Sequence, residues 1–140
     1  MTDDPKNLRH ATLEWTGKLA FTGGTPGGPT ITVDGDGGLG PSPVVVLLLS
    51  AGACAGADVV SILEKMQVKL ASCRIELTGR RNEDYPRRYN HLLLRFILRG
   101  EGLTEANTRR AVELSVTKYC SVLTSLDPAM PVETEILIEE

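Results

Sequence analysis

An almost unbroken run of apolar and small residues from Val44 to Ala57 constrains the fold more than any other feature. Ser42 is a good helix N-cap and Pro43 a good first helical residue, so we predict a long helix from Val44 to about Met66. The apolar run is shorter than the roughly 20 residues of a membrane span, which favours a buried helix in a soluble protein. A helix that is apolar all round is hard to cover within one small subunit, so the run also predicts a partner subunit.

Two glycines lie four residues apart in this helix, Gly52 and Gly56. Each costs about 0.5–1 kcal/mol relative to alanine in a helix interior, which indicates a close neighbour on that side. A second helix is the usual candidate. Cys54 lies between them, one turn before Asp58, and is either a small buried side chain or a reactive thiol. A carboxylate close to it would disfavour the thiolate.

Alternating and helical patterns around this helix predict an α+β fold. Strands are expected at residues 11–16, 18–22, 30–33, 70–78, 89–99 and 132–138, and further helices at 105–118 and 121–126. No repeat or linker is visible, so the 140 residues are expected to form one domain, with residues 1–10 as a flexible N-terminal segment.

The composition excludes several classes of function. A net charge of −3 and an aromatic content of 4% argue against a nucleic-acid partner. The first ten residues lack a signal-peptide core, so we expect a cytoplasmic protein with no membrane partner. The loop Gly35–Gly40 matches GxGxxG, but Pro41 and Pro43 stand where a dinucleotide site needs a running helix. It is therefore expected to be a flexible loop, and no cofactor is predicted.

Three cysteines are candidate reactive groups. With two histidines and no CxxC they offer no zinc-ligand spacing, so no metal is predicted. Cys73 alternates with Arg74 on a strand and is interpreted as core. Cys120 precedes a short predicted helix, whose free N–H groups would stabilise a thiolate. Cys120 and Cys54 could meet in space, although their spacing in the sequence cannot show it.

Four arginines surround the predicted hairpin turn: Arg80, Arg81, Arg87 and Arg88. A solvated turn is the default interpretation of such a cluster, and a site for an anion or an acidic partner is the alternative.

These segments together resemble the OsmC/Ohr family of osmotically inducible and organic-hydroperoxide-resistance proteins, in particular its YhfA-type, OsmC-like branch. The resemblance is carried by Gly40–Pro43, Gly52–Cys54, Ala57–Leu63, Pro86–Arg87, Ala111–Ser115 and Lys118–Val122. It implies antiparallel sheets around long central helices in an intertwined homodimer. It also implies a thiol-dependent reductase of organic hydroperoxides, with Cys54 as the peroxidatic and Cys120 as the resolving cysteine, restored by a dithiol reductant.

The sequence departs from the family's peroxidases near the thiol. They carry a glutamate where this chain has Val45, and an arginine in the N-terminal strands, whereas no arginine lies between Ala11 and Cys54. Arg87, Arg88 or His91 of a partner subunit are the candidates to bind substrate in its place. The alternative function is a small-ligand-binding or redox-sensing protein on the same fold.

Overall fold

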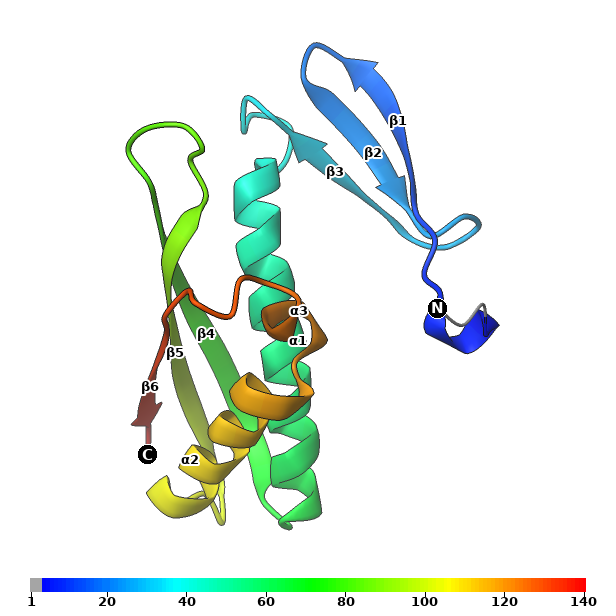
Figure 1. Cartoon of the computed structure of the whole chain (residues 1–140). Coiled ribbons are helices and arrows are strands. Elements are labelled where there is room, and N and C mark those ends of the chain that lie inside the picture. Colours follow the sequence, from blue (N-terminus) through cyan, green and yellow to red (C-terminus); the bar gives the residue numbers. More distant parts are fainter. Residues whose placement is uncertain (1–3) are drawn as a thin grey trace. The chain divides into compact units, whose positions relative to one another are not determined.

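The computed structural model describes residues 4–140, which divide into two compact units, one up to Leu47 and one from Leu48 to Glu140. The predicted order of three strands, a helix, two strands, helices and a last strand is confirmed (Figure 1). The elements are β1 (Thr12–Gly17), β2 (Ala20–Gly24), β3 (Thr30–Asp34), α1 (Pro43–Lys65), β4 (Lys69–Arg81), β5 (Tyr89–Glu101), α2 (Glu105–Leu114), α3 (Ser121–Thr124) and β6 (Val132–Ile138).

The N-terminal segment was expected to be flexible over residues 1–10. Residues 1–3 of it lie outside the described part of the chain. Residues Pro5–Asn7 form a short 3-10 helix, which Asp4 caps by accepting a hydrogen bond from the backbone N–H of Lys6. This part of the segment is therefore folded locally. That the whole chain is one domain stays a prediction.

The first unit is a three-stranded antiparallel sheet in the order β1-β2-β3. Side chains alternate between its faces, and the register places Trp15 opposite Phe21 and Phe21 opposite Val33. This apolar face is open: Trp15 is 66% and Ile31 57% exposed. Large apolar side chains are thus exposed on this face of the first unit.

The glycine-rich loop after β3 is a closed turn. The Asp34 carboxylate accepts hydrogen bonds from the backbone N–H groups of Leu39 (3.0 Å) and Asp36 (2.9 Å). These bonds lower the pKa of Asp34 below its usual value, the bond from Leu39 most. Because the carboxylate already uses these amides, they do not form a phosphate cradle. Asp34 thus anchors the loop at one end, and its flexibility stays a prediction.

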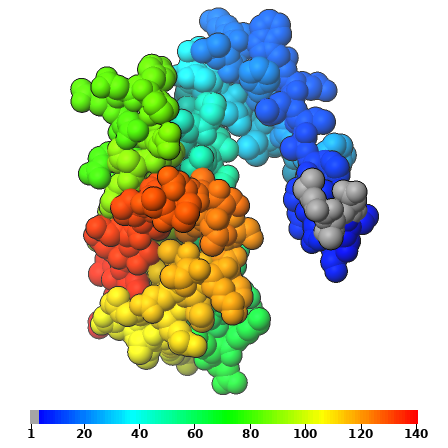
Figure 2. Space-filling view, in the orientation of Figure 1, coloured from blue at the N-terminus to red at the C-terminus, as the bar shows by residue number. Residues whose placement is uncertain are grey.

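The second unit contains a sheet in the order β4-β5-β6 with helices on one face (Figure 1). Strands β4 and β5 form the predicted antiparallel hairpin, and residues 82–88 between them stand at the surface (Figure 2). The expectation of purely antiparallel sheets is wrong for β6, which pairs in parallel with β5. The chain reaches β6 through α2 and α3, and a crossover of that kind allows two strands to run in the same direction.

The core of the second unit lies between this sheet and α1. On α1 the residues Ala51, Ala55, Val59 and Leu63 recur every fourth position, and each is fully buried. They face a layer of fully or nearly fully buried side chains on β5, namely Leu92, Leu94, Phe96 and Leu98. The whole of α1 is long and apolar enough to cross a membrane, although the prediction that it does not do so rests on its uncharged first part alone. One face of α1 packs against the sheet.

The two helix glycines face a strand, which corrects the expectation of a second helix. A Cβ on Gly52 would lie 2.7 Å from a methyl group of Leu77, and one on Gly56 2.7 Å from the terminal methyl group of Ile75. Both neighbours belong to β4. The glycines therefore let α1 approach the sheet closely at the level of Cys54.

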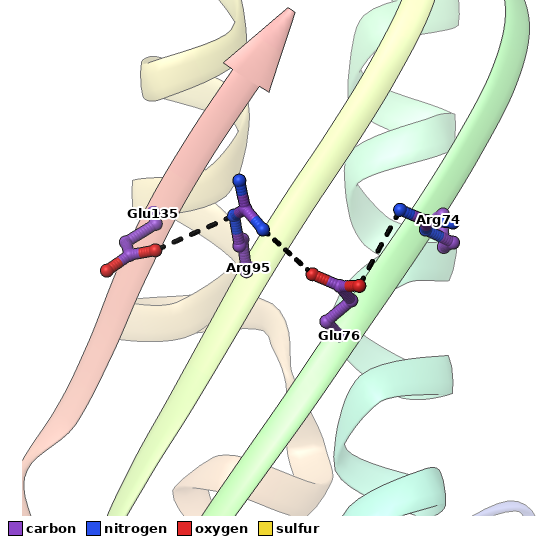
Figure 3. Close-up of polar contacts among 4 residues, drawn as sticks. All are labelled: Arg74, Glu76, Arg95 and Glu135. Atoms are coloured by element: carbon purple, nitrogen blue, oxygen red, sulfur yellow. Dashed lines mark hydrogen bonds and ion pairs between the residues drawn. The ribbon is translucent and has the colours of Figure 1, made fainter.

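The other face of the second sheet is covered by charges. Arg95 lies 3.0 Å from Glu76 and 3.7 Å from Glu135, and Glu76 also lies 3.6 Å from Arg74, so the pairs form a row across three strands (Figure 3). All four side chains are more than a third exposed. Exposed pairs contribute about 0–1 kcal/mol each, so the row keeps this face in water and adds little stability.

Candidate active site

The structure brings the two predicted cysteines together with a carboxylate. The sulfur atoms of Cys54 and Cys120 and a carboxylate oxygen of Asp58 all lie within 4.8 Å of one another. Cys54 and Asp58 lie four residues apart on α1, which places them on one face of the helix. Cys120 is contributed from 66 positions further along the chain. The sequence left the meeting of the two thiols open, and the fold places them side by side.

Cys120 is held firmly in place. Its side chain is fully buried, and its sulfur lies 3.9 Å from the carbonyl oxygen of Ala51. Cys120 is also the N-cap of α3, where its sulfur accepts a hydrogen bond from the backbone N–H of Leu123 at 3.5 Å. These contacts aim the sulfur at the face of α1 that carries Cys54.

An irregular helical turn leads into this position. The residues Ser115–Tyr119 form a π-helical turn, closed by the bond from the Cys120 N–H to the Ser115 carbonyl at 2.8 Å. The sequence predicts a regular α-helix through to Lys118, which is wrong for its last turn. Single π turns are frequent at functional sites because the extra residue changes the direction of the following side chains. Here the turn places Ser115 and Cys120 on the same side, towards α1.

Ser115 connects this turn to the carboxylate. Its buried hydroxyl lies 3.0 Å from Asp58 Oδ2 and 3.1 Å from the carbonyl oxygen of Ala55. Sequence reasoning missed Ser115 as a functional residue. The available signal was its place four residues after Ala111 on the predicted apolar stripe, where a hydroxyl must find a partner once it is buried.

The thiol of Cys120 holds its proton tightly. Burial raises its pKa to about 11; the hydrogen bond with Cys54 and the charge there also raise it, whereas the N–H of Leu123 lowers it. The expectation that the short helix would stabilise a thiolate is therefore wrong. The hydrogen bond from the Leu123 N–H does lower the pKa of Cys120, but the loss of water around the buried sulfur raises that pKa by more.

The cluster also has the donor types of a metal site, since thiolates and carboxylates bind zinc. Metal binding requires deprotonated thiols. The structure describes the group as a cluster of two thiols and a carboxylate, and that it takes no metal stays a prediction.

A cavity of about 290 Å³ lies beside the cluster. Asp58 lines it together with Ser61, Ile62, Lys65, Leu114 and Tyr119. Asp58 thus belongs both to the cluster and to the wall of this cavity, whose lining mixes polar and apolar side chains.

The remaining predicted residues lie elsewhere in the chain. Arg87 and Arg88 belong to the hairpin turn, where the side chain of Arg87 donates to the Asn82 carbonyl at 3.2 Å. His91 pairs with Glu133 at 3.7 Å on the charged face of the sheet. Substrate binding by these three residues stays a prediction. Cys73 packs against the core from β4, as expected, and burial raises its pKa.

The OsmC-like family model matches residues 35–135 of this chain. Protein YhfA of Escherichia coli strain K12 is 41% identical over 121 residues, which cover 86% of this chain and 90% of that protein.

Solved structures agree with this family. A hypothetical protein from Aquifex aeolicus VF5 is 30% identical with a TM-score of 0.85, covering 95% of this chain and 97% of that one. The organic hydroperoxide resistance protein OhrB of Bacillus subtilis has a TM-score of 0.60 at 13% identity, covering 94% and 98%, and this likeness concerns the fold alone. The chain belongs to the OsmC-like family.

Proposed function

We propose that this protein is a thiol-dependent reductase of organic hydroperoxides, with Cys54 as the peroxidatic and Cys120 as the resolving cysteine. The observation that carries the proposal is the pair of sulfurs within 4.8 Å of each other. A disulfide needs an S–S distance of about 2.05 Å, which small side-chain movements could reach from there. The half-buried Cys54 is accessible, whereas Cys120 is enclosed behind it.

The chemistry proceeds in three balanced steps. The Cys54 thiolate attacks the distal oxygen of the hydroperoxide, the O–O bond breaks, and the alkoxide leaves and takes up a proton. This produces a sulfenic acid on Cys54 and one alcohol. The Cys120 thiol then attacks the Cys54 sulfur and water leaves as the disulfide closes. A dithiol reductant, itself oxidised to a disulfide, restores both thiols.

Mild oxidation should link Cys54 to Cys120 within one chain while Cys73 stays free. The two sulfurs lie within 4.8 Å, whereas Cys73 faces the core from β4. Peptide mapping by mass spectrometry after stoichiometric cumene hydroperoxide tests this, with a Cys73→Ser variant as the matched control. A dominant link through Cys73, or no link at all, would contradict the proposed pair.

The rival function is a small-ligand-binding or redox-sensing protein on the same fold. It is favoured by Val45 and by the absence of any arginine between Ala11 and Cys54, since no cation from that stretch other than Lys18 can assist the peroxide. Retention of two adjacent thiols favours the enzyme. A link that forms in the mapping experiment without any peroxide turnover in the presence of dithiol would support the sensor.

We also infer a homodimer as the working form, located in the cytoplasm where thiols stay reduced. The support is the exposed apolar surface within each unit. Trp15 and Ile31 are open on the first sheet, and Leu49 (49%) and Val60 (42%) are open on α1. Ala53 between them is exposed as well. Contiguous apolar surface of this kind marks interaction sites.

The chain should therefore be a dimer at micromolar concentration. Sedimentation velocity measures this directly, and Leu49→Asp should weaken the association because it places a charge on the apolar stripe of α1. Arg74→Asp on the charged sheet face is the control and should leave the mass unchanged. A folded, stable monomer of the unaltered chain would contradict the inference.

A further inference from the structure

Two acceptors lie near the thiol protons: the Ala51 carbonyl, 3.9 Å from the Cys120 sulfur, and the carboxylate of Asp58, of which only the carboxylate can take up a proton. The carboxylate of Asp58 lies within 4.8 Å of both sulfurs, and Cys120 cannot attack a sulfenic acid or a mixed disulfide at a useful rate while it carries its proton. Burial keeps that proton in place by raising the pKa of the Cys120 thiol to about 11. Closure of the disulfide therefore needs a base beside Cys120.

The surroundings of Asp58 fit a carboxyl that gains and loses a proton. While it is ionised, Asp58 can accept the hydroxyl hydrogen of Ser115 at 3.0 Å. Once protonated, it can donate to Ser115 Oγ, because the same hydroxyl can turn its hydrogen to the Ala55 carbonyl at 3.1 Å. The Ser115 hydroxyl therefore has an acceptor for its hydrogen whether Asp58 is ionised or protonated.

We propose that Asp58 is the general base that takes the proton of Cys120 during disulfide closure. As the proton passes to Asp58, the Cys120 sulfur forms the S–S bond with Cys54, and the bond from Cys54 to its hydroxyl breaks. The departing hydroxide takes the proton from Asp58 and leaves as water, which restores the carboxylate. In the peroxide cycle this step rests on the proposed function, but closure can also be driven without peroxide.

The groups around Asp58 are few. On α1 it faces Cys54, with Ser61 and Lys65 along the same cavity. From the opposite side it faces Ser115, Cys120 and, across the cavity, Tyr119. Among these described residues Asp58 is the one carboxylate. Lys65 carries a positive charge, so it would assist the ionised form and does not compete as a base.

The test uses the full chain with Cys73→Ser, reduced and kept in chelator. The disulfide probe DTNB reacts first with the accessible Cys54 and releases one thionitrobenzoate. Attack of Cys120 then closes the disulfide and releases a second, which is followed at 412 nm in a single turnover. At pH 7, Asp58→Asn should slow the second release by about 10²-fold, the lower range of general base catalysis.

The dependence on pH separates a base from a structural role. Without Asp58, closure should follow the small thiolate fraction of Cys120 and accelerate about tenfold per pH unit between pH 7 and 10. With Asp58 present the dependence should be shallower, so that the two rates converge as the pH rises. A merely structural defect would keep a constant ratio between the rates.

Two variants serve as controls. Asp84→Asn, in the exposed hairpin turn, should close as fast as the Cys73→Ser parent. Ser115→Ala should slow closure less than Asp58→Asn does, because the base is still present.

Equal rates for Asp58→Asn and the parent, or a constant ratio over pH, would overturn the inference. So would a tenfold rise per pH unit in the parent itself, which is decisive even where Asp58→Asn does not fold. Slow closure in Asp58→Asn, with no peroxide consumed by the unaltered protein, would refute the proposed function alone.

Discussion

Replacement of Cys54 by serine is expected to abolish the consumption of organic hydroperoxide, and replacement of Cys120 by serine to limit it to about one equivalent per chain. A serine hydroxyl is too weakly acidic to attack the O–O bond as a thiolate does. Without Cys120, the sulfenic acid on Cys54 forms once and has no neighbouring thiol to resolve it. The two variants therefore fail at different steps.

Both variants should fold. Serine differs from cysteine by one atom, and at position 120 it is a favoured N-cap for α3, whose Leu123 N–H already bonds to the side chain there. The measurement is peroxide remaining after addition of cumene hydroperoxide with excess dithiol. Cys73→Ser is the matched control and should keep full turnover. Sustained turnover in Cys54→Ser would remove this residue from the mechanism.

The sequence predicts most of the helices and strands and, of the site, the two cysteines Cys54 and Cys120. The capping residues Ser42 and Pro43 and the apolar run that follows determine α1, and alternation determines all six strands, including β6 to the residue. These features are local. The alternating pattern also places Cys73 on the inner face of β4, and the structure confirms that it packs against the core.

The site itself depends on contacts that a linear pattern does not contain. Ser115 looks like one polar residue at the end of an amphipathic helix, and only the π turn directs it to Asp58 on a helix 57 positions earlier. The expectation of a stabilised thiolate at Cys120 is wrong for a similar reason. A helix start was visible in the sequence, whereas the complete burial that outweighs it is a property of the packed core.

The rate of peroxide reduction is expected to be low, although measurable. Charge that develops on the departing oxygen needs a fixed donor, and loss of one such donor typically costs about 10²–10³ in rate. The family's glutamate position holds Val45, and no arginine lies between Ala11 and Cys54. Within the cluster the neighbouring ionisable groups are a carboxylate and a second thiol, so neither provides a positive charge.

Organic hydroperoxides should nevertheless react faster than hydrogen peroxide. The α1 residues next to Cys54 are small and apolar, and burial of an organic group contributes about 1.5–3 kcal/mol, or roughly 10-fold to 100-fold in the second-order rate. Stopped-flow measurement of Cys54 oxidation by cumene hydroperoxide and by hydrogen peroxide gives this ratio. A ratio near one would mean that the organic group finds no apolar surface near the thiol.

If instead both rates were fast, a cation from outside the segment between Ala11 and Cys54 must assist the thiol. Arg87→Ala, Arg88→Ala and His91→Ala would then show which predicted side chain supplies it, since only the true donor should lower the rate by 10²-fold or more.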